Sequence, residues 1–166
     1  GEYTSSAGVL YNEANPRGEL DKGALPIKYG EDPEDTGSGS AIDYIVLRYA
    51  DVLTLQAEAL ARNANSVTQE AVDLLNMVRQ RAGIPTYKVG DFGSLESFLN
   101  AVLTERGHEL YFEGWRRSDL IRHGKFIAYA KLYKKSRTAA PHHVLFPLPQ
   151  KIINEGRGLV IQNEGY

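Results

Sequence analysis

Two stretches of apolar residues recur at helical spacing, and the short polar break between them constrains the fold more than any other feature. In the first stretch, 41–62, the apolar stripe consists of Ile42, Ile45, Tyr49, Leu53 and Leu60, while Asp51, Gln56 and Glu58 fall off it. The second stretch occupies 66–83. This spacing predicts two amphipathic helices joined as a hairpin, 41–83, of about tetratricopeptide length. One hairpin does not bury its own apolar face, and ~3 repeats are normally needed, so we expect preceding hairpins that are absent from this chain.

The residues after the hairpin predict further helices and then an irregular tail. Residues 94–123 are expected to form two helices, because Ser94 suits an N-cap and Gly124 suits a C-terminal stop. The tail, 124–166, is expected to hold short helical turns and a short strand at 144–146. The predicted fold class is therefore mainly α, of the α-α superhelix type, with irregular loops and a few short strands.

The first forty residues differ in character from the rest of the chain. They contain an Asn-Pro-Arg-Gly turn signal at 15–18 and a Gly/Ser-rich run at 36–40. Short strands are expected between these signals, at 8–12 and 25–29. The predicted organisation is a loop-rich arm over 1–40 followed by a helical domain over 41–166.

Composition excludes several classes of protein. Nineteen basic against twenty-one acidic side chains give a net charge of −2, which argues against nucleic acid as a partner because phosphate binding needs a basic excess. No apolar run approaches the roughly 20 residues that cross a bilayer, and the chain opens without the pattern of an export signal. With no cysteine there is no disulfide, thiol nucleophile or lipidation site. We also expect no metal and no cofactor, since the paired His142 and His143 lack an accompanying carboxylate cluster.

Glu105, Glu109 and Glu113 lie at i, i+4 and i+8 of one predicted helix, which is the most enzyme-like pattern in the chain. Two carboxylates flanking a glycosidic bond are what glycoside hydrolysis requires, so Glu105 and Glu109 are the candidates for that chemistry. The favoured alternative is structural, with the carboxylates paired to guanidinium groups between helices. The candidate partners are Arg48, Arg79, Arg81, Arg106, Arg116 and Arg117. On this interpretation there are no catalytic residues.

Ten tyrosines suggest a different chemistry. Aromatic rings stack on the apolar faces of sugar rings, while Asn and Arg side chains bond sugar hydroxyls. In the arm these residue types are Tyr11, Asn12, Arg17 and Tyr29, which we name as candidate glycan contacts. The alternative is that tyrosine simply fills amphipathic surface positions.

Several segments together resemble the SusD/RagB family of outer-membrane lipoproteins. They are, in order, RYADVL at 48–53, AEAL at 57–60, LNMVRQRAG at 75–83, ERGHELYFEGWRRSDLIR at 105–122, LFPLPQ at 145–150 and QNEGY at 162–166. The chain departs from the family pattern at Glu164, where proline is usual, and at 156–158, where an Asn-Pro-Asn type of turn is usual. Both departures affect only turns of the tail.

The resemblance implies a non-enzymatic protein that captures oligosaccharide or polysaccharide and presents it to a SusC-like TonB-dependent transporter. It implies a location at the outer membrane, facing outward, through a lipid anchor that is not in this chain, and a longer parent whose C-terminal part this chain resembles. Two alternatives remain open: a helical scaffold that docks on the transporter without binding sugar, and, least favoured, a glycoside hydrolase using Glu105 and Glu109.

Overall fold

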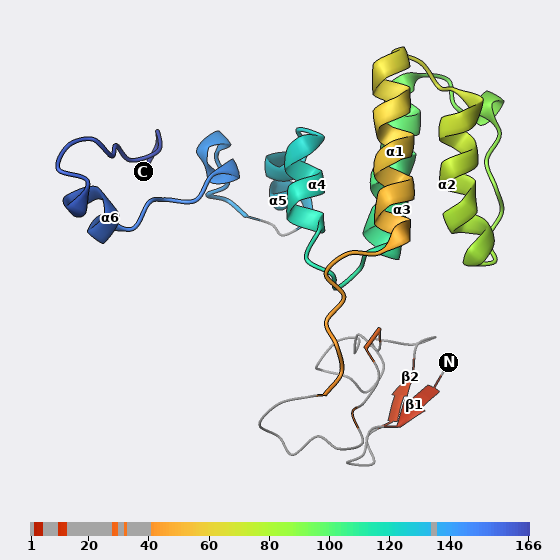
Figure 1. Cartoon of the computed structure of the whole chain (residues 1–166), viewed down its shortest axis with the longest axis horizontal. Helices are drawn as coiled ribbons and strands as arrows, with labels where there is room; N and C mark the ends of the chain where they lie inside the picture. Colours follow the sequence, from red (N-terminus) through yellow and green to blue (C-terminus); the bar gives the residue numbers. More distant parts are fainter. Residues whose placement is uncertain (1, 5–9, 13–27, 30–31, 33–40, 134–135) are drawn as a thin grey trace. The chain divides into compact units, whose positions relative to one another are not determined.

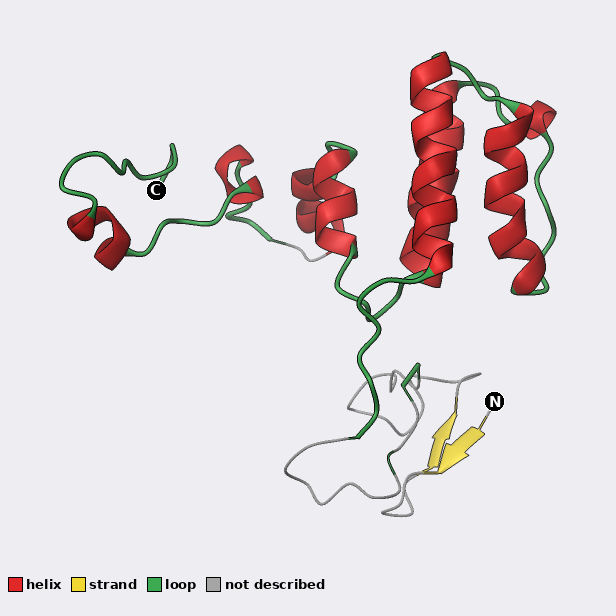
Figure 2. Cartoon of the chain, viewed as in Figure 1, coloured by secondary structure: helices red, strands yellow, loops and turns green. Residues whose placement is uncertain are grey.

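The computed structural model of the chain describes residues 2–4, 10–12, 28–29, 32, 41–133 and 136–166. The chain divides into two compact units, Gly1–Val46 and Leu47–Tyr166. Helices dominate the second unit (Figure 2), which confirms the prediction of a mainly helical fold. The predicted domain boundary at 40/41 remains a prediction.

The first unit contains two short strands. Strand β1 (Glu2–Thr4) pairs antiparallel with β2 (Leu10–Asn12), so that Tyr3 lies opposite Tyr11. Strand β2 falls within the segment predicted at 8–12. Most of the other predicted strand, at 25–29, lies outside the described residues.

The predicted hairpin is formed by helices α1 (Tyr49–Ala64) and α2 (Gln69–Arg81), and α1 packs against both α2 and α3 (Leu95–Glu109) (Figure 1). Residues 41–48 are not helical, although the apolar spacing predicted a start at 41. Branching at Cβ in Ile42, Ile45 and Val46 disfavours a helix there. The apolar spacing could not detect this local preference.

Local capping residues set the ends of α2 and α3. Thr68 caps α2, because its hydroxyl accepts a hydrogen bond from the Ala71 N–H at 3.2 Å. Gly83 ends the hairpin in the left-handed region, with φ of +71°, where glycine is favoured. At α3 the predicted cap is confirmed, since the Ser94 hydroxyl accepts from the Ser97 N–H at 3.1 Å.

The core lies where the hairpin meets α3. Three alanines allow α1 and α2 to approach closely, and larger side chains from α2 and α3 fill the space between them. The fully buried members are Ala57, Ala61, Ala71, Val72, Leu75, Phe98 and Val102. The core therefore joins all three helices, and the hairpin does not have one of its own.

Helix α3 ends at Glu109, followed by a turn, by α4 (Arg116–Arg122) and by α5 (Phe126–Tyr133). The tail carries a 3-10 turn, η2 (Pro141–Val144), and a last helix, α6 (Gln150–Glu155). The strand predicted at 144–146 is wrong. The carbonyl group of Val144, and that of His143 just before the segment, accept hydrogen bonds from Arg117 rather than from a neighbouring strand.

Candidate functional site

Glu105 and Glu109 of α3, and Glu113 in the turn after it, are held by arginines from other elements. Arg79 of α2 donates to Glu105 at 2.5 Å. Glu109 accepts from Arg48, which precedes α1, and from Arg81, each at 2.5 Å. Arg48 also donates to both oxygens of Glu113, at 2.9 and 3.0 Å. Because these carboxylates are paired and little exposed, they tie α3 to the hairpin.

Arg116 and Arg117, two further candidate ion-pair residues, donate to backbone carbonyl oxygens. Arg116 Nη1 donates to the Leu103 carbonyl at 2.7 Å. Its guanidinium lies across α3 at Gly107, where a Cβ would come within 2.7 Å of Nη1. Arg117 bonds the tail and lies 4.2 Å from the ring centroid of Phe146. These two side chains therefore position α4 on α3 and on the tail.

A buried ionic network is centred on Arg106, whose carboxylate partners, Asp51 and Asp119, were not predicted from the sequence. The Arg106 side chain is completely buried; its Nε donates to Asp119 at 2.9 Å and its Nη1 lies 2.7 Å from Asp51. Nη1 also donates to the Thr54 hydroxyl at 2.8 Å. One guanidinium thus links α1, α3 and α4.

A second buried carboxylate, Glu58 of α1, continues this network. It accepts hydrogen bonds from Arg122 at 2.9 and 3.1 Å and from Arg62 at 2.9 Å, and His123 Nε2 lies 3.1 Å away. Arg122 also donates to Asp119 at 2.9 Å. Burial alone would raise the pKa of Glu58, but the contacts with His123 and Arg122 outweigh it and hold the pKa well below its ordinary value.

This depressed pKa makes stability depend on pH. Since the folded-state pKa of Glu58 lies below its unfolded value of about 4.3, its contribution is complete above that pH and is lost as pH falls through the folded pKa. As pH falls from about 5 to about 3, we expect the free energy of unfolding to decrease more in wild type than in Glu58→Gln. The difference between the two decreases should be on the order of 2 kcal/mol. Urea titrations at a series of pH values measure this. Glu155→Gln, at an exposed position, is the control, and parallel curves for wild type and Glu58→Gln would contradict the assignment.

The structural and the hydrolase interpretations of Glu109 predict different effects of the substitution Glu109→Gln. If the carboxylate is structural, Glu109→Gln should weaken its bonds to Arg48 and Arg81 and lower the free energy of unfolding by about 1–3 kcal/mol. Thermal unfolding and a reducing-sugar assay on a panel of polysaccharides test this together. Hydrolysis by the wild type that disappears in a variant of unchanged stability would show the carboxylate to be catalytic.

The candidate glycan contacts of the arm are only partly described. Tyr11 and Asn12 lie in β2, Arg17 lies outside the described residues, and Tyr29 stacks on Tyr44 with ring centroids 5.7 Å apart. The structure thus shows an aromatic pair at Tyr29. The joint placement of the four residues remains a prediction.

Neither a metal site nor a membrane helix is found in the described part of the chain. Its described residues contain no group of three or more His, Asp or Glu side chains able to hold a metal ion. His143 Nδ1 accepts a hydrogen bond from the Ala140 N–H at 2.9 Å, so the His142–His143 pair belongs to the η2 turn. Among the described helices none has the length and apolar character needed to span a bilayer.

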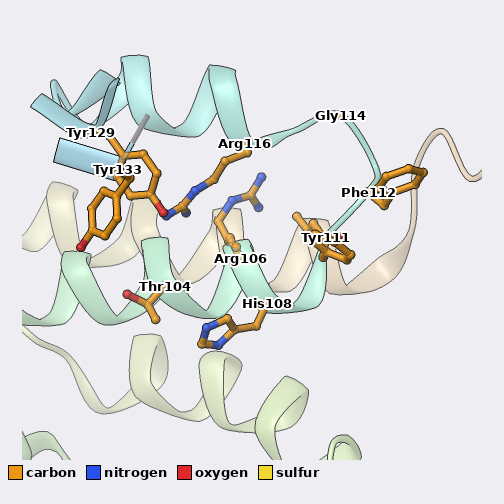
Figure 3. A pocket seen from close by; sticks show the side chains of 11 residues that line it. Thr104, Arg106, His108, Tyr111, Phe112, Gly114, Arg116, Tyr129 and Tyr133 are labelled. Atoms are coloured by element: carbon orange, nitrogen blue, oxygen red, sulfur yellow. The ribbon is translucent and has the colours of Figure 1, made fainter. Parts of the chain in front are cut away.

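A cavity of about 620 Å³ opens between α3, the turn after it and α5 (Figure 3). None of the residues that line it is a carboxylate. They are Thr104, Arg106, Gly107, His108, Leu110, Tyr111, Phe112, Gly114, Arg116, Tyr129 and Tyr133. The Glu105–Glu109 pair does not face this cavity, which removes the geometric basis for a hydrolase there.

The protein is mainly helical, and its carboxylates are paired with arginines of other elements, so these ionic clusters are structural. The SusD family model matches residues 4–166, and the chain belongs to this family. It is 32% identical over 130 residues to the starch-binding protein SusD of Bacteroides thetaiotaomicron, covering 75% of this chain and 22% of that protein. The relatives are named for binding carbohydrate and not for a reaction on it, in agreement with the prediction that this chain is not an enzyme.

Solved structures give the same family. A SusD homolog from Bacteroides thetaiotaomicron is 33% identical, with a TM-score of 0.66, over 76% of this chain and 28% of the other. Surface glycan-binding protein A of the same organism, in complex with laminarihexaose, is 27% identical, with a TM-score of 0.58, over 75% of this chain and 27% of the other. The chain therefore spans about a quarter of the length of the relatives that it matches.

Proposed function

We propose that this chain belongs to a glycan-binding protein of the bacterial surface, which captures oligosaccharide or polysaccharide without breaking bonds in it. The observation that carries the proposal is the family match over 4–166, supported by relatives named for starch binding and for a complex with laminarihexaose. The pairing of Glu105, Glu109 and Glu113 with arginines supports a non-catalytic role. The whole protein would present the glycan to a SusC-like TonB-dependent transporter, from a lipid anchor in the outer membrane.

The glycan contacts that we propose in this chain are Tyr11, Asn12, Arg17 and Tyr29. The stacked pair of Tyr29 and Tyr44 supports this choice, because paired rings offer a flat apolar face to a sugar. Tyr44 is itself more than half exposed.

Calorimetric titration with maltohexaose and laminarihexaose tests the proposal. We expect saturable binding of at least one of them, with no new reducing ends after long incubation. Tyr29→Ala should weaken that binding by about tenfold, since stacking on one ring contributes on the order of 1 kcal/mol. Tyr166→Ala is the matched control in the second unit. Bond cleavage would contradict the proposed class of function, whereas equal affinities for wild type and Tyr29→Ala would contradict only the placement of the site.

A second candidate is a helical scaffold that binds the transporter but not sugar. It is favoured by the large apolar side chains that remain exposed in the second unit, among them Tyr49, Tyr111 and Phe112. Co-purification with the transporter together with flat titrations against both oligosaccharides would favour this role.

A further inference from the structure

The 3-10 turn η2 is closed by a histidine ring that accepts a hydrogen bond. His143 Nδ1 accepts from the Ala140 N–H at 2.9 Å, and the His143 N–H donates to the Ala140 carbonyl at 3.0 Å. An imidazole nitrogen accepts a hydrogen bond only while it carries no proton. The closed turn therefore requires the neutral ring of His143, with its one proton on Nε2.

Side chains at the end of the tail hold the segment that follows η2. The Gln162 amide bonds both backbone groups of Leu148, at 2.8 Å to the N–H and 3.0 Å to the carbonyl. Two more contacts, each at 2.8 Å, join the Asn163 amide to the Phe146 carbonyl and the Tyr166 hydroxyl to the Leu145 carbonyl. We name Gln162, Asn163 and Tyr166 the tail clasp. It fixes 162–166 against 145–148.

The turn and the tail clasp share contacts. The His142 ring lies 4.1 Å from the His143 ring and meets the Tyr166 ring edge-on, with centroids 4.8 Å apart. Gly165, with a φ of +93°, lies so close that a Cβ there would come within 2.6 Å of the His142 ring. The carbonyl that Tyr166 bonds belongs to Leu145, directly after η2. A rearrangement of the turn therefore displaces the clasp.

The charges around η2 do not compensate a positive charge on it. The titratable or charged side chains on the turn and on the segments packed against it are His142, Arg117, Tyr129, Lys131, Tyr133, Glu164 and Tyr166. Arg117 donates to the His143 carbonyl at 3.3 Å, so its guanidinium lies next to the turn. Glu164, beside His142, is exposed, and solvent screens its attraction. A protonated His143 would thus face an N–H donor and a guanidinium rather than a buried carboxylate.

We propose that His143 makes the tail clasp sensitive to pH. Histidine is the side chain that changes charge between about pH 8 and pH 5. When Nδ1 of His143 takes a proton from solvent, it faces the Ala140 N–H as a second donor and the hydrogen bond is lost. The turn then opens and 162–166 separates from 145–148, while the core formed by α1, α2 and α3 stays folded.

Hydrogen exchange on the millisecond-to-second scale tests the proposal, with protection factors corrected for the intrinsic effect of pH on exchange. Peptides that cover 142–148 and 162–166 report the clasp, and a peptide from α3 reports the core. Wild type is compared at about pH 8 and about pH 5 with His143→Asn, because asparagine offers an acceptor on the same Cγ and does not titrate. His108→Asn, at an exposed position of α3, is the matched control.

In wild type and in His108→Asn we expect the tail peptides to be at least about fivefold less protected at the lower pH, the usual effect of losing one cap. In His143→Asn their protection should change by less than about twofold, as should that of α3 in all three proteins. Gln162→Ala, which removes the clasp alone, should leave 162–166 equally unprotected at both pH values.

Nitrogen-15 NMR of the imidazole of His143 provides a second measurement, which does not depend on the stability of any variant. The loss of tail protection in wild type should follow the same pH curve as the protonation of His143. Unchanged tail protection in wild type, an equal fall in His143→Asn, or opening along a different pH curve overturns the proposal. So does an equal loss of protection in α3, because that indicates global unfolding.

Discussion

Replacing Arg106 with Met is expected to lower the free energy of unfolding by about 3–5 kcal/mol. The side chain is completely buried and contacts two buried carboxylates, on α1 and on α4. Removing the guanidinium leaves Asp51 with an uncompensated charge in a site that excludes water, and leaves Asp119 with Arg122 as its remaining ion-pair partner. Since a domain is stable by only about 5–15 kcal/mol, this loss is a large share of the total free energy of unfolding.

Urea titration followed by far-ultraviolet circular dichroism measures this effect. Lys151→Met is the control, because Lys151 forms an exposed pair with Glu155 at 3.7 Å and should change stability by less than about 0.5 kcal/mol. Adding Asp51→Asn and Asp119→Asn to Arg106→Met should recover part of the loss, since the penalty comes from unpaired charge. A loss no larger than that of the control would show that the network contributes little.

Replacing Phe98 with Ala is expected to cost about 3–5 kcal/mol for a different reason. Phe98 is fully buried among Ala57, Ala61, Leu75 and Val102, and its ring meets Phe92 edge-on at 5.1 Å. The small alanines of α1 cannot expand to fill the space that the ring leaves. A cavity therefore remains where the hairpin joins α3.

The same urea titration measures the Phe98→Ala loss, with Leu159→Ala as the control at an exposed position. The control should change the free energy of unfolding by less than about 0.5 kcal/mol. A loss below about 1 kcal/mol for Phe98→Ala would mean that neighbouring side chains collapse into the space.

Helix ends that depend on residues close to them in the sequence could be predicted. Ser94 caps the start of α3 and Gly83 ends the hairpin. Both a hydroxyl cap and a glycine in the left-handed region affect only the few residues next to them in the sequence. The family resemblance also came from contiguous segments. By contrast, the strand predicted at 144–146 depended on a pairing partner that its own residues do not specify.

Buried charges were the main feature that sequence reasoning missed. Asp51 and Glu58 fall off the apolar stripe of α1, yet each is only 3% exposed. Tyr49 belongs to that stripe and is 65% exposed. Periodicity treats a carboxylate as a solvent-facing residue and does not reveal the arginines, 55 and 64 positions away, that make burial acceptable. One available signal was the concentration of arginines between 105 and 122.

The Arg106 network also bears on the order in which the chain can fold during synthesis. Asp51 and Glu58 emerge from the ribosome with α1, but Arg106 and Arg122 follow only after 55 and 64 more residues. Until then Asp51 lacks its arginine and Glu58 has only Arg62 of its own helix, so a hairpin of α1 and α2 cannot yet bury the two carboxylates as the native fold does. The hairpin is therefore not an autonomous folding repeat. It reaches its native packing only after α4 has been synthesised.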